Sequence, residues 1–291
     1  MNKNFPLALT AMTAFALNSL FCRFALGTEV IDPVGFTLIR LVSGAVTLVA
    51  LSYLLDDQRQ NQSSLKLSQC QSLSLGLSLF GYALLFSFAY ITLDTGTGAL
   101  ILFGTVQLAL IAYHRISGHE ISKLEMVGIA IALTGFASLL LPSASQPSVV
   151  GTVLMVLSGV CWSIFTILGK SVPSPILATK QGFLVASGFM ILYFILSLFV
   201  SSESILFNAS GALYAVLSGS LASAVGYFLW YSLLPKIDVL DASLLQLTVP
   251  VIAMALGWLF IGETVSAMSL LSTFLILGGI GLVSWFKLQR K

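Results

Sequence analysis

The chain has 291 residues, of which 57% are hydrophobic and 8% are charged, and its formal net charge is +2. A soluble domain carries about 25% charged residues to cover its surface, whereas the mean hydropathy here is +1.01. The composition excludes a soluble enzyme, a secreted disulfide scaffold and a disordered chain, and it predicts a protein embedded in a lipid bilayer. The small net charge predicts no nucleic-acid partner.

Apolar stretches long enough to cross a bilayer follow one another along the whole sequence. A helix needs about 20 mostly apolar residues to span the hydrocarbon core. Ten stretches meet this requirement, at residues 5–26, 33–55, 72–93, 96–113, 124–141, 149–169, 177–200, 211–234, 240–260 and 267–286. The first is interpreted as a transmembrane helix and not as a signal peptide, because Phe21 before Cys22 is too large for a lipoprotein cleavage site. The predicted fold class is an all-α integral membrane protein.

Two of these helices carry start signals in the sequence. Ser122 and Glu125 have the spacing of a capping box before the fifth span. Asp241 is placed to cap the ninth span.

The cations predict the orientation, because Lys and Arg concentrate in cytoplasmic loops. With the N-terminus inside, eleven of the thirteen Lys and Arg residues fall on cytoplasmic segments. These are Lys3, Arg59, Lys66, Arg115, Lys123, Lys170, Lys180, Lys236, Lys287, Arg290 and Lys291. The sequence therefore predicts a multi-pass protein of a bacterial inner membrane with both termini in the cytoplasm.

The two halves of the sequence resemble each other at an offset of 143 residues. The matching elements are Glu120 with Glu263, Gly135 with Gly278, and Thr105-Val106-Gln107 with Thr248-Val249-Pro250. We therefore expect two repeats, at residues 1–142 and 148–291. Five spans per repeat is an odd number, so the second repeat is expected to be inverted, which is the geometry of alternating access.

Several of these elements resemble the EamA-type branch of the drug/metabolite transporter superfamily. They are Asn18 and Arg23 in the first span, Pro33 and Arg40 in the second, Thr248-Val249-Pro250, Gly262-Glu263 and Gly278. The sequence departs from the family pattern at Gln107, where proline is usual, and at Phe15-Ala16, where tryptophan and glycine are usual. The resemblance implies ten helices in two five-helix repeats and export of small metabolites through a central cavity.

Polar side chains near the middle of the spans are the candidates for solute binding, because an unpaired polar group in hydrocarbon costs several kcal/mol. Gln107 and Gln246 both donate and accept hydrogen bonds, so they suit amino and carboxyl groups, or they join helix to helix. Pro250 frees the carbonyl of Gln246, which either binds a ligand or marks a kink. The predicted binding residues are Asn18, Arg40, Tyr82, Gln107, Trp162, Gln246 and Pro250.

Arg23 and Arg40 lie within adjacent spans, toward the predicted outer side. A buried guanidinium is expensive and usually functional, so the pair favours a carboxylate, either of a solute or of Glu29 or Asp32. Alternatively, their long side chains reach the wet interface. Arg23 is a candidate for gating.

Aromatic residues and one histidine complete the candidates. Tyr82, Phe86 and Tyr90 form a stripe that either stacks a solute or packs against a helix, and the indole N–H of Trp162 needs an acceptor. Tyr227 and its neighbours Trp230 and Tyr231 are interpreted as an interfacial belt. His114 either titrates during gating or is an interfacial polar residue.

The sequence lacks residues that two known transport mechanisms require. No Asp or Glu lies in the central third of a predicted span, which argues against proton-coupled export of cationic drugs, and no phosphate-binding loop is present for ATP hydrolysis. The three scattered cysteines predict neither a metal site nor a disulfide framework, and no cofactor is expected.

The leading hypothesis is an exporter of small zwitterionic or anionic metabolites, best amino acids, acting as a monomer or homodimer. An integral-membrane lipid or isoprenoid transferase and a non-transporting scaffold subunit are the alternatives.

Overall fold

The fold is taken from a computed structural model, which describes residues 5–56, 67–118, 122–139, 147–172, 174–200, 206–233 and 245–289. Its elements are α1 (Phe5–Leu26), α2 (Pro33–Asp56), α3 (Gln69–Ala89), α4 (Thr95–Ile116), α5 (Lys123–Leu139), α6 (Val149–Lys170), α7 (Pro175–Val200), α8 (Ala209–Leu217), η1 (Ser218–Val225), α9 (Gly226–Leu233), α11 (Thr248–Ile261) and α12 (Ala267–Gln289).

Seven of the described helical segments are long and apolar enough to cross a membrane, and two shorter apolar helices accompany them. The segments coincide with the stretches that hydropathy selects, so the all-α membrane fold is confirmed. The predicted capping box is confirmed as well: Ser122 accepts the Glu125 backbone N–H, and Glu125 accepts the Ser122 backbone N–H.

Two predicted spans differ from the helices that the structure describes. The third helix begins earlier than residue 72, because Ser68 and Gln71 form a reciprocal capping box, and it ends at Ala89. The ninth helix is interrupted at Leu247, and α11 begins at Thr248. Asp241, the predicted cap of this span, lies outside the described residues.

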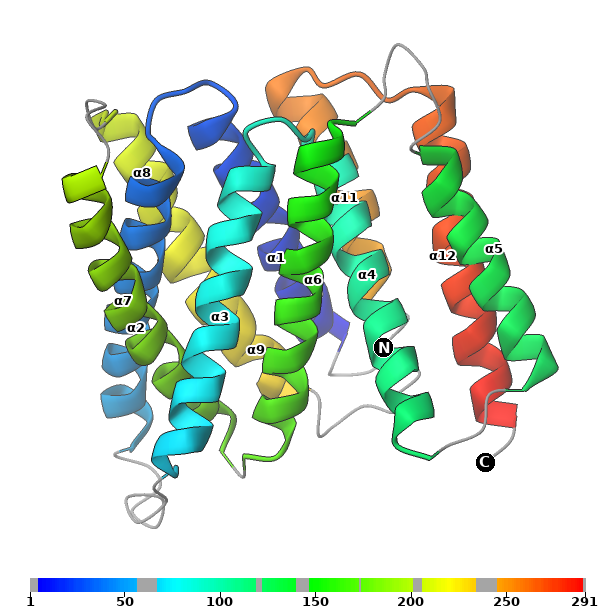
Figure 1. The fold of residues 1–291 in the computed structure, drawn as a ribbon, viewed down its shortest axis with the longest axis horizontal. Coiled ribbons are helices and arrows are strands. Elements are labelled where there is room, and N and C mark those ends of the chain that lie inside the picture. Colours follow the sequence, from blue (N-terminus) through cyan, green and yellow to red (C-terminus); the bar gives the residue numbers. More distant parts are fainter. Residues whose placement is uncertain are drawn as a thin grey trace.

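The two halves of the chain enter the bundle from opposite sides. α1–α5 make five crossings, an odd number, so α6 runs in the opposite direction to α1 (Figure 1). The loops at residues 27–32, 90–94 and 262–266 therefore share one side of the molecule, at the top of Figure 1, which is called the upper face below. On this face Ile31 forms an antiparallel bridge with Phe207, so a loop of the first half meets a loop of the second.

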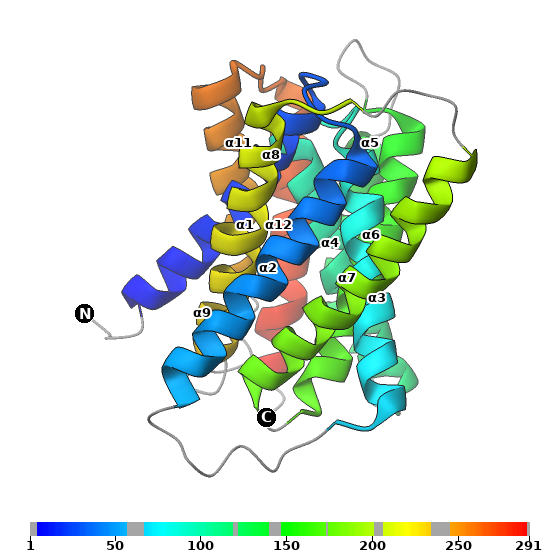
Figure 2. The same ribbon diagram turned by 90° about the vertical axis from the view of Figure 1, so that its left-hand side faces the viewer.

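The eighth span is continuous from Ala209 to Leu233, but its middle, η1, is a π-helix. Figure 2 shows this helical segment, α8–η1–α9, beside α1 and α2. Gly219 allows the close approach, because a Cβ atom there would overlap the Arg40 carbonyl oxygen and Ser43 Oγ of α2. π-helical turns occur frequently at functional sites, and this one lies directly against Arg40.

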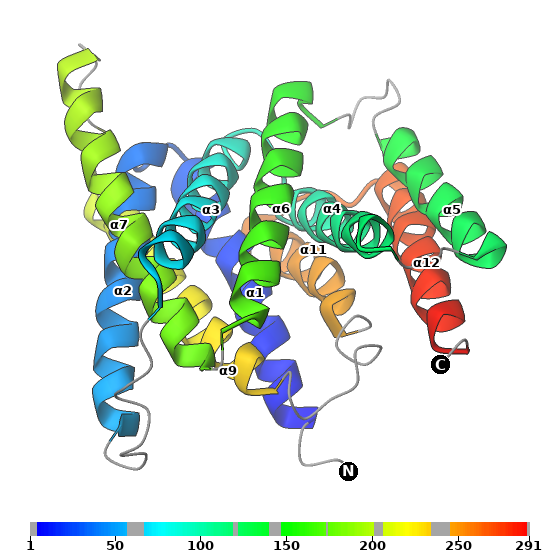
Figure 3. The same ribbon diagram turned by 60° about the horizontal axis from the view of Figure 1, so that its bottom comes forward.

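α5 and α12 pack on each other at one end of the molecule, apart from most other helices (Figures 1 and 3). Glycines make this contact close. A Cβ at Gly128 would lie 2.7 Å from the Gly279 carbonyl oxygen, and a Cβ at Gly279 would lie 2.5 Å from that of Gly128. Small residues of this kind let membrane helices approach backbone to backbone.

Gly279→Val is expected to destabilise the protein by about 1–3 kcal/mol, the usual cost of overpacking, because the α5–α12 backbones must separate. Gly281→Val, on the same helix, is the matched control, since nothing lies within 4 Å of a Cβ at Gly281. Thermal unfolding of the two purified variants in detergent measures the difference. Equal melting temperatures would contradict the tight α5–α12 contact.

Candidate functional site

Arg40 lies buried at the centre of the bundle, with 1% of its surface exposed. Its Nη2 donates to the Tyr82 hydroxyl at 3.0 Å and its Nε donates to Ser223 Oγ at 3.4 Å. The guanidinium also lies over the rings of Tyr82 and Phe86, 5.2 and 4.9 Å from their centroids. Its Nη1 has no hydrogen-bond partner, and no carboxylate pairs with Arg40 among the described residues. The charge is held by hydroxyls and aromatic faces alone.

The Tyr82 hydroxyl joins four helical segments. Besides the Arg40 bond, it accepts Asn18 Nδ2 at 3.3 Å and the Tyr227 hydroxyl at 3.4 Å. Ser218 Oγ in turn donates to Asn18 Oδ1 at 2.6 Å. Three donors thus surround one oxygen, which has only two lone pairs. The centre therefore holds a surplus of hydrogen-bond donors over acceptors.

The π-helix explains why two serines reach this network. Its bonds run from residue i to residue i+5, so Ser218 and Ser223 lie on the same side of η1. Ser218 contacts Asn18 of α1 and Ser223 contacts Arg40 of α2.

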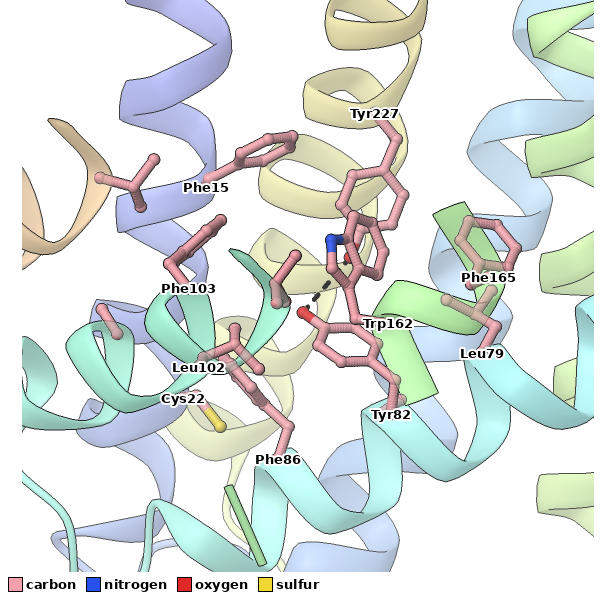
Figure 4. Packing of buried hydrophobic residues seen from close by; sticks show 14 of the residues in the cluster. Phe15, Cys22, Leu79, Tyr82, Phe86, Leu102, Phe103, Trp162, Phe165 and Tyr227 are labelled. Atoms are coloured by element: carbon pink, nitrogen blue, oxygen red, sulfur yellow. Dashed lines mark hydrogen bonds between the residues drawn. The ribbon is translucent and has the colours of Figure 1, made fainter. Parts of the chain in front are cut away.

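A small cavity adjoins this network, and aromatic rings form most of its wall (Figure 4). Trp162 lies between Tyr82 and Tyr227, with ring centroids 4.9 and 4.7 Å away. The cavity volume open to the centre of a water-sized sphere is about 10 Å³, which is room for about one water molecule. The lining residues are Phe15, Asn18, Ser19, Tyr82, Phe86, Leu102, Phe103, Trp162 and Tyr227. The structure is therefore closed around its centre.

Four of the predicted binding residues meet here. Asn18, Tyr82 and Trp162 line the cavity, and Arg40 contacts Tyr82. Gln107 and Gln246 lie elsewhere, where Gln107 Nε2 donates to Gln246 Oε1 at 3.2 Å.

Two further candidates lie apart from the cavity. Pro250 falls in the first turn of α11, directly after the helix break. His114 belongs to α4, but its side chain lies outside the described part of the chain.

Arg23 occupies a second cluster, at the upper face. Its Nε pairs with Glu263 at 3.2 Å and its Nη2 with Asp94 at 3.5 Å, while Nη1 donates to the carbonyls of Tyr90 and Ile91. Of the carboxylates that the sequence suggested, neither Glu29 nor Asp32 pairs with Arg23, so that alternative is wrong. Asp32 instead accepts backbone N–H groups at the start of its own helix α2, and Glu29 is exposed.

Glu263 also caps a helix of the other half. Asp94, the residue before α4, makes no side-chain cap. The Thr95 backbone N–H donates instead to Glu263 Oε1 and Oε2 at 3.0 and 2.9 Å, and Thr95 Oγ1 donates at 3.1 Å. A carboxylate at a helix N-terminus is favoured by the unpaired N–H groups and by the helix dipole. Arg23, Asp94, Thr95 and Glu263, the upper-face cluster, thus tie the two halves together.

Burial raises the pKa of the Glu263 carboxyl above its ordinary value, and the Thr95 hydrogen bonds and the Arg23 charge reverse only part of this change. The native state therefore holds this proton more tightly than the unfolded chain. This tighter binding of the proton stabilises the native state fully below the unfolded pKa of about 4.3. The stabilisation is lost as pH rises through the raised native pKa.

Wild-type stability is accordingly expected to fall as pH increases from about 4 through the raised pKa, and Glu263→Gln, which cannot titrate, should flatten this part of the curve. Thermal unfolding of both proteins across this pH range tests it. Parallel curves would contradict the assignment to Glu263.

The structure adds residues that the sequence reading left out. Tyr227 was assigned to an interfacial belt, but it is buried and lines the cavity, so that interpretation is wrong. Trp230 and Tyr231 are buried too. The sequence does contain a signal for Tyr227. It lies four residues after Ser223, and this spacing places both polar groups on one side of the eighth span.

No group of three or more His, Cys, Asp or Glu side chains suited to a metal ion occurs in the described ranges.

Among the described residues, seven long apolar helices and two shorter ones pack around a polar centre, which defines a multi-pass membrane protein. The sequence profile of the EamA-like transporter family matches residues 3–141 and again residues 149–285. The chain belongs to this family.

Similar proteins agree with this assignment. An uncharacterized protein of Pseudomonas aeruginosa is 39% identical over 98% of this chain and 95% of its own. A probable amino-acid metabolite efflux pump of Salmonella typhimurium is 24% identical over 73% of this chain and 78% of its own. One solved crystal structure is 20% identical, covers 97% of both chains and has a TM-score of 0.66, which supports the fold.

Proposed function

We propose that this transporter exports small carboxylate-bearing metabolites, amino acids among them, by alternating access between residues 1–142 and 148–291. Export would proceed across a bacterial inner membrane, with both termini in the cytoplasm and the upper face outside. The protein would act as a monomer or homodimer without a cofactor.

The observation that carries this proposal is the uncompensated guanidinium of Arg40. A charge at membrane depth costs at least about 2.5–3.5 kcal/mol, and arginine cannot lose its proton in a protein. Nη1 has no partner, and the surrounding network is rich in donors. A solute carboxylate supplies both the missing negative charge and the missing acceptor atoms.

The closed centre of the protein supports transport by alternating access. A cavity with room for one water molecule cannot hold a metabolite, so the two halves must separate for a solute to enter. The contacts that would part lie between halves: Arg40 with Ser223, Asn18 with Ser218, and Arg23 with Glu263. Inverted repeats provide two such states from one fold. The Salmonella relative named as a probable amino-acid metabolite efflux pump supports the choice of solute class.

Reconstitution into proteoliposomes tests this function. Vesicles loaded with a mixture of amino acids and other small carboxylates, and matched vesicles without protein, are followed for release of each solute. We expect at least one carboxylate to leave only the protein-containing vesicles. Release of amines alone, or of no solute under any gradient, would overturn the proposal.

A further inference from the structure

Aromatic side chains make up most of the wall of the central cavity. Six of its nine lining residues carry rings: Phe15, Tyr82, Phe86, Phe103, Trp162 and Tyr227. They come from five different helices, α1, α3, α4, α6 and α9. Only Leu102 is aliphatic. Arg40 does not line this cavity, but it contacts two of the wall residues, Tyr82 and Phe86, so a carboxylate anchor adjoins a surface of ring faces.

These rings contact one another across the boundary between the halves. Phe15 of α1 meets Tyr227 and Trp230 of α9 edge to face, with centroids 5.7 and 6.1 Å apart, and Tyr82 of α3 meets Trp162 of α6. Aromatic pairs in such geometries are stabilised beyond their buried area. Opening the halves for a solute breaks these pairs. A ring on the solute restores ring-to-ring contacts, whereas a saturated group of equal size restores only buried area.

Among the described residues, no carboxylate lines the cavity to pair with an ammonium group. The acidic residues Glu263 and Asp94 belong to the upper-face cluster, where they pair with Arg23. In the central network, Asn18 Oδ1 already accepts Ser218, and the Tyr82 oxygen already accepts three donors. The fixed charge of Arg40 also repels a second cation.

We propose, building on the proposed function, that the preferred solutes are aromatic monocarboxylates, whose carboxylate binds Arg40 Nη1 and whose ring inserts between Trp162, Tyr82 and Tyr227. An α-amino group is tolerated but not recognised.

Four compounds of nearly equal size separate the parts of this proposal: 3-phenylpropionate, 3-cyclohexylpropionate, phenylalanine and 2-phenylethylamine. Binding of each to the purified full chain is measured by calorimetry. We expect 3-phenylpropionate to bind at least tenfold more tightly than 3-cyclohexylpropionate, phenylalanine to bind within threefold of 3-phenylpropionate, and the amine not to bind.

Two variants locate the ring site. Trp162→Leu should reduce the phenyl-to-cyclohexyl ratio toward one. Phe80→Leu is the matched control and should preserve the ratio, because Phe80 packs on Phe189 and Tyr193 of α7 and does not line the cavity. Size-exclusion chromatography verifies that both variants remain monodisperse.

The outcomes distinguish this inference from the function on which it rests. Equal binding of the phenyl and cyclohexyl acids overturns the aromatic preference and leaves carboxylate export standing. Binding of the amine as tight as that of 3-phenylpropionate overturns the role given to Arg40. Failure of all three carboxylates to bind a monodisperse protein, together with no release of any carboxylate from proteoliposomes, overturns both.

Discussion

Arg40→Gln is expected to lower carboxylate transport by about 10- to 150-fold, because a hydrogen bond to a charged group is worth about 1.5–3 kcal/mol and each 1.4 kcal/mol is about a factor of ten. The glutamine amide nitrogen takes about the place of Arg40 Nε and can still donate to Ser223 Oγ, so the surrounding network keeps one of its bonds. What disappears is the positive charge and the unpartnered donor at Nη1. Initial rates of release from proteoliposomes, at matched protein content, measure the effect.

Protein stability separates a binding role of Arg40 from a structural one. Removing a buried charge without a counter-ion relieves a desolvation cost, so the Gln variant should melt at or above the wild-type temperature while it loses transport. Arg40→Lys should be intermediate in transport, since lysine keeps the charge but loses the planar stacking on Tyr82 and Phe86.

Lys180→Gln serves as the control for this prediction. Lys180 is a half-buried lysine that donates to Ser52 Oγ and does not line the central cavity, and its replacement should leave transport unchanged. Full transport by Arg40→Gln, or loss of transport only in step with loss of stability, would remove Arg40 from the binding site.

Hydropathy is enough to place the crossings, because each helix must be apolar over the thickness of the bilayer whatever its neighbours are. Two differences from the predicted spans have local causes. Ser68 and Gln71 extend α3 by a capping box, and the helix break at Leu247 lies shortly before Pro250. Such signals involve only one or two residues. Hydropathy averaged over a window of about 20 residues does not detect them.

The composition of the site follows less completely from sequence. Asn18, Arg40, Tyr82 and Trp162 are identifiable, because a polar or indole group at membrane depth requires a partner wherever the helix turns. Tyr227 escapes this reasoning, because it lies toward the predicted cytoplasmic end of its span, where aromatic residues are common at the membrane interface; only its four-residue spacing from Ser223 indicates that the two share one side.

Long-range pairing is the other limit of sequence reasoning. Arg23 bonds Glu263, which is 240 residues away in sequence, whereas Glu29 and Asp32 lie nearest along the chain. The choice between these acids depends on how the halves dock. Gln107 and Gln246 illustrate the same limit: the sequence leaves open whether their amides bind a solute or join helix to helix, and only docking of the halves places them in one hydrogen bond.

The upper-face cluster leads to the second large expected effect. Glu263→Ala should open this face, because it removes the cap of α4 and leaves the Arg23 guanidinium without its 3.2 Å partner. Removing one member of a buried pair costs about 3–5 kcal/mol, and because Asp94 remains as a second partner of Arg23 we expect a cost of about 3 kcal/mol, which shifts a two-state equilibrium by about 100-fold toward the open state. Glu263→Gln should have a smaller effect, since its amide oxygen can still accept the Thr95 N–H.

Cys22 provides the readout for opening. This thiol precedes Arg23 and is fully buried, while Cys70 is exposed and Cys161 is half-buried. In a Cys70→Ser, Cys161→Ser background, a membrane-impermeant maleimide added from the upper-face side should label Cys22 at least tenfold faster in Glu263→Ala than with Glu263 intact. Glu29→Gln is the matched control, because Glu29 is exposed on the same face, and it should leave labelling unchanged. If Cys22 stays equally protected in Glu263→Ala, the ion pair does not hold this face closed, and closure must come from the aromatic contacts beneath it.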